Sequence, residues 1–360
     1  MVRWRSGTVT ALRRRWRGAV ELEVRQADGT AVRALAYPEL VGDPQPGDRV
    51  LMNVGALLMG LGTGGYAMVV ALPDRLPPDP PETVETRDAG HLVKARYTPL
   101  QPIVLGVDEE ASPHRAALVD ADDLAGLPVV TADLHSALPA IVAGIRADAP
   151  DARIGYLMTD GGALPAWFSR TLDGLRGQLA GTVSVGQAFG GDLEATNLHS
   201  GLLAARHVLG ADVAIVAQGP GNLGTGTRWG FSGVAVGEAV NAVAALGGRP
   251  VGSLRISGAD PRERHRGLSH HSATAYGRVA LAAADLVLPA ELPPELATLV
   301  EPALAPLADR HRIVRVPVHG LDEALRTAPV TLSTMGRGLA EEHAYFLAAA
   351  AAGRHAASLR

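Results

Sequence analysis

The chain contains no cysteine, and this absence removes several kinds of chemistry at once. Thiol nucleophiles, disulfides, thiolate-bound zinc and cysteine-held iron–sulfur clusters are all excluded. Lysine is nearly as scarce, since Lys94 is the only lysine among the 33 cationic residues. A phosphate loop of the Gly-Lys-Ser/Thr type is therefore absent, and a Schiff-base mechanism would have to use Lys94.

Aromatic residues and net charge are also low. Aromatics make up 4% of the 360 residues and the formal net charge is -4, so neither base stacking nor a basic surface points to nucleic acid. The N-terminus has no apolar core of the kind a signal peptide needs. The uncharged run 50–72 is interrupted by glycines, which favours two buried strands over a membrane span. We therefore expect a cytoplasmic protein without membrane contact.

The pattern along the chain divides it into three regions. Residues 1–72 alternate apolar and polar in short runs, with a hairpin turn at Asp28-Gly29, and predict a small all-β, barrel-like domain. Residues 73–126 combine a Pro-rich linker with connecting strands, and the part from residue 91 on could belong to either neighbour. Residues 127–360 predict a Rossmann-like α/β domain.

The third region alternates apolar β-type runs with alanine-rich helical segments. This rhythm predicts βαβ crossovers, and hence an α/β fold with a mostly parallel, doubly wound (Rossmann-like) sheet and helices on both faces. The expected strands are 128–133, 153–158, 182–186, 212–217, 250–256, 285–288, 312–316 and 330–334. The expected helices are 135–148, 163–176, 194–209, 233–247, 272–283, 295–309, 320–326 and 338–352.

The loop 218–233 follows the fourth expected strand and is rich in glycine. Ligands of such sheets bind beyond the carboxyl ends of the strands, and the backbone N–H groups of a glycine loop can form a concavity for an anion. The alternative is a surface loop that only needs turns. The candidate ligand-binding residues are Gly219, Gly221, Asn222, Gly224, Thr225, Gly226, Thr227 and Arg228.

The loop 257–272 follows the fifth expected strand and is crowded with cations and imidazoles. Such crowding is costly unless an anion is near, so a phosphate or polycarboxylate ligand is the favoured interpretation. The alternative is a solvated loop neutralised by Asp260 and Glu263. The candidate ligand-binding residues are Arg262, Arg264, Arg266, His270 and His271, together with Arg337, which lies between two glycines near the C-terminal helix.

The same histidines could instead join carboxylates in a metal site. His270 and His271 with Asp133, His135 and Asp160 would supply suitable ligand types. Adjacent residues of an extended chain point in opposite directions, however. Anion binding is therefore favoured, and the sequence assigns no metal ligand and no cofactor.

Four residues are candidates for acid–base chemistry because they can carry a proton and lie in the loops at strand ends. The two carboxylates among them could equally cap the helices that follow. The candidates are Asp133, His135, Asp160 and His265.

Several runs of residues are distinctive: Gly219–Thr227, Arg262–His271, Thr334–Gly338 and Phe346–Gly353. Together with Gly62–Tyr66 they resemble the bacterial family called domain of unknown function 3866, over nearly the whole chain. The resemblance implies a bacterial cytoplasmic protein. It implies no activity and no catalytic residue.

The expected function is the binding of an anionic small molecule, phosphorylated compounds included, together with acid–base chemistry on it. A non-catalytic ligand-binding or protein-interaction scaffold is the alternative, so whether the protein is an enzyme is left open. The alanine-rich stretch 348–352 could pack in a homo-oligomer interface or close the domain. A weaker alternative is nucleic-acid binding through the basic N-terminus, which contains Arg3, Arg5, Arg13, Arg14, Arg15 and Arg17.

Overall fold

The computed structural model describes residues 2–61, 64–78 and 90–360. Most of the predicted Pro-rich linker, residues 79–89, lies outside this part, as do residues 62 and 63 of the glycine run in the first region. The chain divides into two compact units. The first comprises residues 1–104 and 167–173, and the second comprises residues 105–166 and 174–360.

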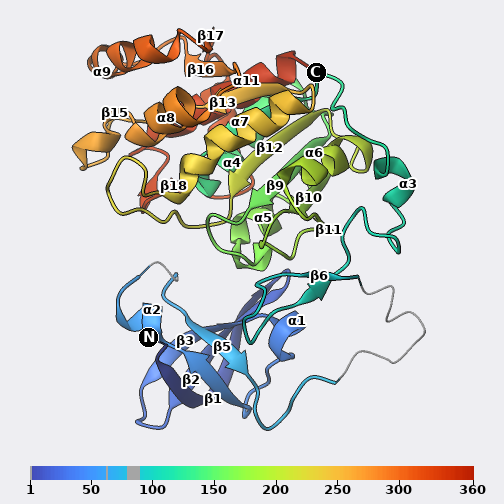
Figure 1. The fold of residues 1–360 in the computed structure, drawn as a ribbon. Helices are drawn as coiled ribbons and strands as arrows, with labels where there is room; N and C mark the ends of the chain where they lie inside the picture. Colours follow the sequence, from blue (N-terminus) through green and yellow to red (C-terminus); the bar gives the residue numbers. More distant parts are fainter. Residues whose placement is uncertain (1, 62–63, 79–89) are drawn as a thin grey trace. The chain divides into compact units, whose positions relative to one another are not determined.

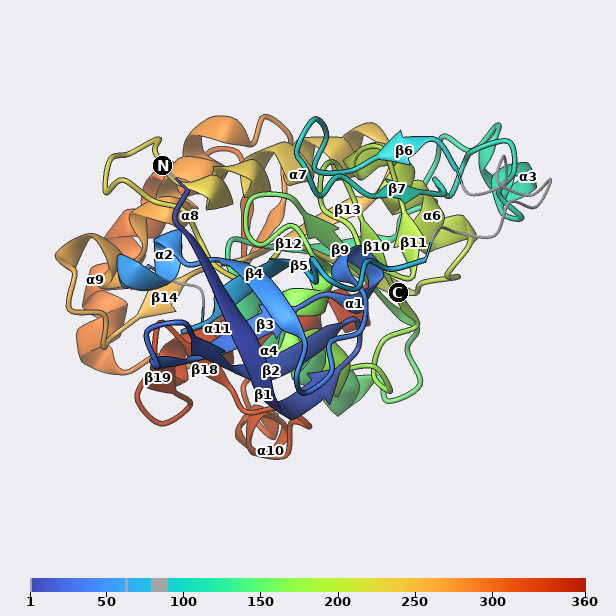
Figure 2. The same cartoon turned by 90° about the horizontal axis from the view of Figure 1, so that it is seen from below.

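The first unit is built on a closed barrel of five strands, seen in Figure 2, which confirms the predicted barrel. The predicted hairpin at Asp28-Gly29 joins the second and third strands, with Gly29 at a φ of 84° and the Asp28 carboxylate accepting from the Thr30 N–H at 2.9 Å. The strands pair in the order β1-β2-β3-β5-β4. Their bounds are β1 (Trp4–Trp16), β2 (Ala19–Gln26), β3 (Ala31–Ala36), β4 (Arg49–Asn53) and β5 (Ala67–Ala71).

The alternation of the barrel strands separates an apolar interior from a charged exterior. Arginines of β1 lie on the exposed side, where Arg13 forms an ion pair with Glu23 and Arg15 with Asp43. The strand pairs with β2 on one side and β4 on the other, so it is not a sheet edge. The buried side chains that fill the barrel include Val9, Val20, Leu22, Val24, Val50, Met52 and Val69.

Short elements complete the first unit and lead into the second. A segment from far along the chain joins the barrel unit, because the Trp16 indole N–H donates to the Trp167 carbonyl at 2.7 Å. Residues 91–104 belong to this unit, and residues 105–126 belong to the second. The short elements are α1 (Pro38–Val41), α2 (Gly55–Leu58), β6 (Leu92–Val93), β7 (Ile103–Val104) and, in the second unit, α3 (Arg115–Leu118).

The second unit contains a parallel sheet of eight strands, which confirms the predicted Rossmann-like fold (Figure 1). The strand order is β11-β10-β9-β12-β8-β13-β16-β17. Their bounds are β8 (Pro128–Ala132), β9 (Ile154–Thr159), β10 (Gly181–Ser184), β11 (Leu193–Glu194), β12 (Val213–Gln218), β13 (Arg249–Ser253), β16 (Asp285–Pro289) and β17 (Arg312–Val316).

One predicted strand and one predicted helix are wrong. Residues 330–334 do not join the sheet; β18 (Ser333–Thr334) instead pairs with β19 (Arg337–Gly338) in a separate hairpin, and β11 is the eighth strand. Residues 331–334 alternate between exposed and buried, which suits a hairpin with one solvated face rather than a strand covered on both faces. The helix expected over 163–176 is only a short turn, 166–168, and α5 (Arg170–Gly174).

The sheet is covered on both faces. In Figure 1, α6 (Leu198–His207), α7 (Ala235–Ala245) and α8 (His270–Thr274) lie on one face. Helices α4 (Leu138–Asp148) and α11 (His343–Ser358) lie on the other, and α10 (Leu321–Arg326) packs against both. Helix α9 (Pro294–Leu304) joins the apolar cluster that contains residues of α7 and of the turn after α8. Among the described residues, no helix is both long and apolar enough to cross a membrane.

The alanine-rich C-terminal helix closes the α/β unit from within. Residues 348–352 of α11 are buried against α4 and the sheet. The two helices approach so closely that a Cβ added at Gly144 would lie 1.9 Å from the Ala350 carbonyl oxygen, and one added at Gly353 would lie 2.1 Å from that of Ile141. This stretch therefore serves the core of one chain.

The connections of β8 and its two neighbours leave the sheet in opposite directions. Strand β8 leads to α4 on one face, while its neighbours β12 and β13 lead to α7 and α8 on the other. Adjacent strands whose connections leave in opposite directions form a switch point, where ligands of doubly wound sheets bind. The loops after β8, β12 and β13 therefore meet at the place where a site is expected.

Candidate functional site

The loops after β8, β12 and β13 are joined by direct contacts. Asp133 follows β8, and its carbonyl accepts from the side-chain amide of Gln218, at the end of β12, at 2.6 Å. Its carboxylate oxygen Oδ2 lies 3.3 Å from the Nδ1 atom of His271, which belongs to the segment after β13. Three of the predicted loops thus form one site.

Six charged residues at this site, which we call the inner cluster, are linked by ion pairs. They comprise three carboxylates and three guanidiniums, so their formal charges cancel. All but Arg262 and Arg337, which are half-buried, are buried. The six residues are Asp133, Arg255, Asp260, Arg262, Arg337 and Glu342.

Asp260 is the centre of the inner cluster. Its carboxylate accepts two hydrogen bonds from the Arg262 guanidinium, at 2.9 and 2.7 Å, and one from Arg337 at 3.3 Å. Arg255 lies 3.5 Å away. Burial acts to raise the pKa of Asp260, but the hydrogen bonds from Arg262 outweigh it and hold the pKa well below its usual range. Asp260 therefore stays ionised and binds three arginines together.

Glu342 ties the C-terminal segment to the same cluster. Its Oε1 atom accepts from Arg337 Nε at 2.7 Å and from the Ser257 hydroxyl at 2.8 Å. The Ser257 oxygen in turn accepts from the Asp260 N–H at 2.9 Å. Arg337, a predicted ligand residue, is therefore held by two carboxylates within the protein.

Asp133 and Arg255 extend the cluster toward the histidines. Arg255 Nη1 lies 3.7 Å from Asp133 Oδ2 and 3.3 Å from His271 Nδ1. Burial acts to raise the pKa of Asp133, but the hydrogen bond with His271 and the charge of Arg255 keep it below its ordinary value. An ionised carboxylate can only accept and a guanidinium can only donate, so His271 Nδ1 donates when it bonds Asp133 and accepts when it bonds Arg255, and the two bonds exclude each other.

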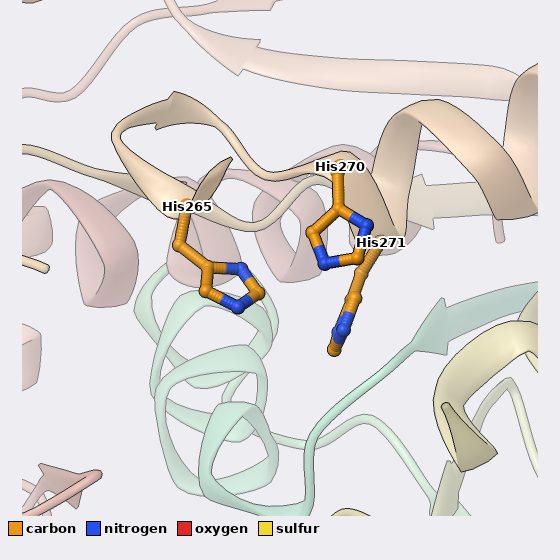
Figure 3. Close-up of side chains that lie close together, drawn as sticks. All are labelled: His265, His270 and His271. Carbon is orange, nitrogen blue, oxygen red and sulfur yellow. The ribbon is translucent and has the colours of Figure 1, made fainter. Parts of the chain in front are cut away.

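Three imidazoles, which we call the histidine trio, lie around one space next to the inner cluster (Figure 3). One ring nitrogen of each residue lies within 4.8 Å of a ring nitrogen of each of the others. His271 also stacks face to face on Phe231, with ring centroids 3.8 Å apart. The trio consists of His265, His270 and His271.

Local structure explains why two adjacent histidines share one space. The extended conformation expected for residues 270 and 271 is wrong, because they form the first turn of α8, where the Ser269 hydroxyl oxygen accepts from the His271 N–H at 3.2 Å. Consecutive helical residues are about 100° apart, not 180°. A π-helical turn, Ala275–Val279, follows and is anchored to β8 by a 2.9 Å hydrogen bond from the Tyr276 hydroxyl to the Thr131 carbonyl.

The surroundings of the trio favour neutral imidazoles. Burial, with the positive charges of Arg255 and Arg262, lowers the pKa of His265 to about 3. Burial, with His271 and Arg264, lowers the pKa of His270 to about 4. Both rings are therefore uncharged near neutral pH, when they can accept a proton or donate a lone pair to a metal.

An open pocket of about 660 Å³ lies beside His270. Arg228 comes from the loop after β12, Arg264 from the loop after β13, and Arg278 from the π-helical turn. We call these three the outer arginines. In the part of the chain that the structure describes, their side chains form no ion pair and no hydrogen bond. The pocket therefore carries three unbalanced positive charges.

The glycine-rich loop after β12 is folded on itself. The Asn222 side-chain oxygen accepts from the Ser232 hydroxyl at 2.8 Å, from Gln218 at 3.0 Å and from the Gly233 N–H at 3.3 Å. Thr225 and Thr227 hydrogen-bond to each other at 3.0 Å. Of the predicted ligand residues here, Gly226 and Arg228 line the pocket. Gly219 packs on the Ala163 backbone, Gly221 has a φ of 89°, and Gly224 forms an isolated antiparallel bridge with Phe231.

Two of the four acid–base candidates lie apart from the trio. His135 Nδ1 lies 3.0 Å from the Tyr156 hydroxyl, and burial lowers the pKa of His135 to about 4. Asp160 accepts from the Gln187 N–H at 3.0 Å, so it fixes the turn after β10. The other two, Asp133 and His265, lie together at the site.

The predicted arginines fall into three groups, and two further arginines of the site were not predicted. Arg262 and Arg337 belong to the inner cluster, Arg264 and Arg228 line the pocket, and Arg266 is exposed outside the pocket lining. Arg255 and Arg278 fell inside an expected strand and an expected helix, so loop position gave no signal for them. A charged residue at the end of the apolar run 250–256 was the available signal for Arg255.

The chain is a two-unit protein, in which a barrel unit is followed by a doubly wound α/β unit. Charged and imidazole side chains lie at the switch point of the α/β unit. Residues 33–353 match the family described as Protein of unknown function (DUF3866). The chain therefore belongs to this family, which confirms the resemblance read from its sequence. A comparison with curated proteins found no match.

Proposed function

We propose that the α/β unit binds an anionic small molecule in the pocket lined by the outer arginines and His270. The observation that carries the proposal is that Arg228, Arg264 and Arg278 converge on one pocket and have no acidic partner among the described residues. Unbalanced like charges repel, so a bound anion would relieve a cost that the free protein bears. Guanidinium groups also match the geometry of phosphate and carboxylate oxygens.

The inner cluster supports this proposal by its contrast with the pocket. Arg255, Arg262 and Arg337 already have carboxylate partners, so they are not available to an external anion. Their role is to fix the loop that carries Arg264 and His265. The anion site is therefore assigned to the outer arginines rather than to every cation of the two loops.

The test is a thermal-shift titration of the wild-type protein with inorganic phosphate, pyrophosphate, phosphorylated metabolites and dicarboxylates. We expect at least one of these anions to raise the melting temperature. Changing Arg264→Gln or Arg278→Gln should weaken its binding about 10- to 100-fold, because a hydrogen bond to a charged group contributes about 1.5–3 kcal/mol.

Arg266→Gln is the matched control, since Arg266 lies on the same loop as Arg264 and is exposed, but does not line the pocket. It should leave the affinity within about twofold. If no anion stabilises the wild-type protein, or if Arg266→Gln weakens binding as much as Arg264→Gln, anion binding at this pocket is refuted.

Acid–base chemistry on the bound anion is the second candidate function, and His270 favours it. Its ring lines the pocket, and because burial lowers its pKa to about 4, the imidazole is unprotonated at neutral pH and has a lone pair available to a proton of the ligand. His270→Gln should keep most of the anion affinity and abolish any conversion of that anion. Retained conversion would exclude His270 as the base. The non-catalytic scaffold, the cytoplasmic location and the basic N-terminus as a nucleic-acid site stay predictions.

A further inference from the structure

We infer that the histidine trio, His265, His270 and His271, forms a binding site for a divalent transition metal of the zinc type. Imidazole nitrogen is a preferred ligand for zinc, copper, iron and nickel, and three ring nitrogens here lie within 4.8 Å of one another (Figure 3). The chain has no thiolate, so a site for such a metal would have to rely on histidine and carboxylate.

An unsatisfied buried atom points independently to a ligand. The Nε2 atom of His270 is inaccessible to solvent and has no hydrogen-bond partner among the described residues. A buried polar atom without a partner costs free energy comparable to a lost hydrogen bond. A metal ion bound to this nitrogen would satisfy it.

The second ring nitrogens of the other two histidines are already held. His271 Nδ1 lies 3.3 Å from the Asp133 carboxylate, and His265 Nδ1 lies 2.8 Å from the Ser269 hydroxyl. Metal-bound histidines usually donate the N–H of their other nitrogen to a carboxylate or another oxygen, which fixes the tautomer. This arrangement leaves Nε2 of His265 and His271 as the metal-facing atoms.

Metal binding would require the ring nitrogens of the trio to move only slightly closer together. Zinc–nitrogen bonds of about 2.0–2.1 Å place tetrahedral ligand nitrogens about 3.4 Å apart, so a pair at the 4.8 Å limit would have to approach by about 1.4 Å. Rotation of exposed or half-buried rings can supply this movement, and His270 is half-buried. The charge of Arg255 opposes a cation, but Asp133 and Asp260 lie beside it and offset that charge.

The site does not depend on anion binding in the pocket. Three protein ligands leave a fourth position open, as in catalytic rather than structural zinc sites. Because His270 belongs both to the trio and to the pocket lining, an anion in the pocket could reach that open position. The metal and the anion can nevertheless be tested separately.

The experiment is titration of the chelator-treated, full-length protein with Zn²⁺ by calorimetry and with Co²⁺ by visible absorption. We expect one ion per chain with a dissociation constant at or below the micromolar range, and intense Co²⁺ bands of the kind that four-coordinate nitrogen sites give. His270→Gln should weaken binding at least 100-fold, and Asp133→Asn about 10- to 100-fold.

His319→Gln is the control, because His319 is exposed and lies outside the trio; it should leave the affinity unchanged. Circular dichroism of the metal-free variants shows whether they fold, and the wild-type stoichiometry and Co²⁺ spectrum stand even if a variant does not. Absence of stoichiometric binding to the wild type, or equal binding by a folded His270→Gln protein, overturns the metal site. Phosphate stabilisation without any metal binding would leave the anion proposal intact and refute only this inference.

Discussion

The inner cluster and the outer arginines lie in the same unit, come partly from the same loop, and differ in how their charges are balanced. Inside, three guanidiniums meet three carboxylates at 2.7 to 3.7 Å. Outside, three guanidiniums face one pocket without an acidic partner in the described chain. The same residue type therefore serves structure in one place and is available for a ligand in the other.

This contrast shows that a run of cations in a loop is not by itself a binding site. Asp260 is buried and ionised, and it takes up the charge of the arginines nearest to it. Only the guanidiniums beyond its reach remain to attract an anion.

The largest effect is expected from Asp260→Asn. The substitution leaves Arg255, Arg262 and Arg337 with one fewer buried charge partner. Removing one partner of a buried ion pair typically costs about 3–5 kcal/mol, so the free energy of unfolding should fall by that order. Chemical denaturation measures it.

Glu263→Gln, on the same loop but exposed, is the control and should change the free energy of unfolding by less than about 0.5 kcal/mol. Equal stability of the Asp260→Asn and wild-type proteins would mean that the inner cluster does not hold the loop.

A second effect comes from pH, through the buried His135 at the end of β8. Its pKa falls from 6.5 in the unfolded chain to about 4 in the folded protein because of burial. The unfolded chain therefore binds more protons between pH 6.5 and 4, and stability is present in full above pH 6.5 and declines as the pH falls through this window. The contribution is on the order of 3 kcal/mol.

The comparison of wild type with His135→Gln isolates this contribution. The free energy of unfolding of the variant should fall less steeply between pH 6.5 and 4, whereas exposed His319→Gln should follow the wild-type curve. Parallel curves for wild type and His135→Gln would show that His135 does not stay neutral in the folded protein.

A third, smaller effect on stability is expected in α7, which packs against the π-helical turn after α8. A Cβ added at Gly237 in α7 would lie 2.4 Å from the Ala275 carbonyl oxygen, at the start of the π-helical turn. Such overpacking costs about 1–3 kcal/mol, so Gly237→Ala should lower the midpoint of chemical denaturation. Gly258→Ala, where nothing lies within 4 Å, should behave as wild type; equal stability of both variants would contradict the close contact.

The smallest effect on stability is expected from the outer arginines. Arg228→Gln, Arg264→Gln and Arg278→Gln each remove an exposed, unpaired charge, so the free energy of unfolding should stay within about 0.5 kcal/mol of wild type or rise slightly as repulsion falls. Thermal melts without added anion measure this. If the free energy of unfolding fell by more than about 1 kcal/mol, these arginines would be structural, like those of the inner cluster, and the distinction between the two groups would be wrong.

Much of the site was predictable at the level of loops. Parallel strands end at one edge of a sheet, so the period of the apolar runs indicated that the loops starting at 218 and 257 lie together. Asp133, His265, His270 and His271 were identified in this way, and the structure brings them together. Side-chain partners were not predictable, because they depend on residues far apart in sequence: Arg337 meets Asp260, 77 positions away.

Two further arginines of the site, Arg255 and Arg278, were not predicted because they lie within regular apolar patterns. Arg255 lies within an expected strand and Arg278 within an expected helix, and the periods of these elements carry no signal of a functional role. A short departure from regularity places each of them: β13 ends at Ser253, two residues before Arg255, and a π-helical turn, Ala275–Val279, carries Arg278. Neither departure has a distinct signature in hydrophobic periodicity.

The sequence by itself determined the barrel and the parallel α/β sheet, because these follow from local runs and their periods, and its motifs carried the resemblance to the family. The tertiary structure alone decided which charges are balanced and which are open, since pairing depends on side chains brought together from separate strands. It also decided that His270 and His271 share one space, because the turn of α8, and not an extended chain, carries them.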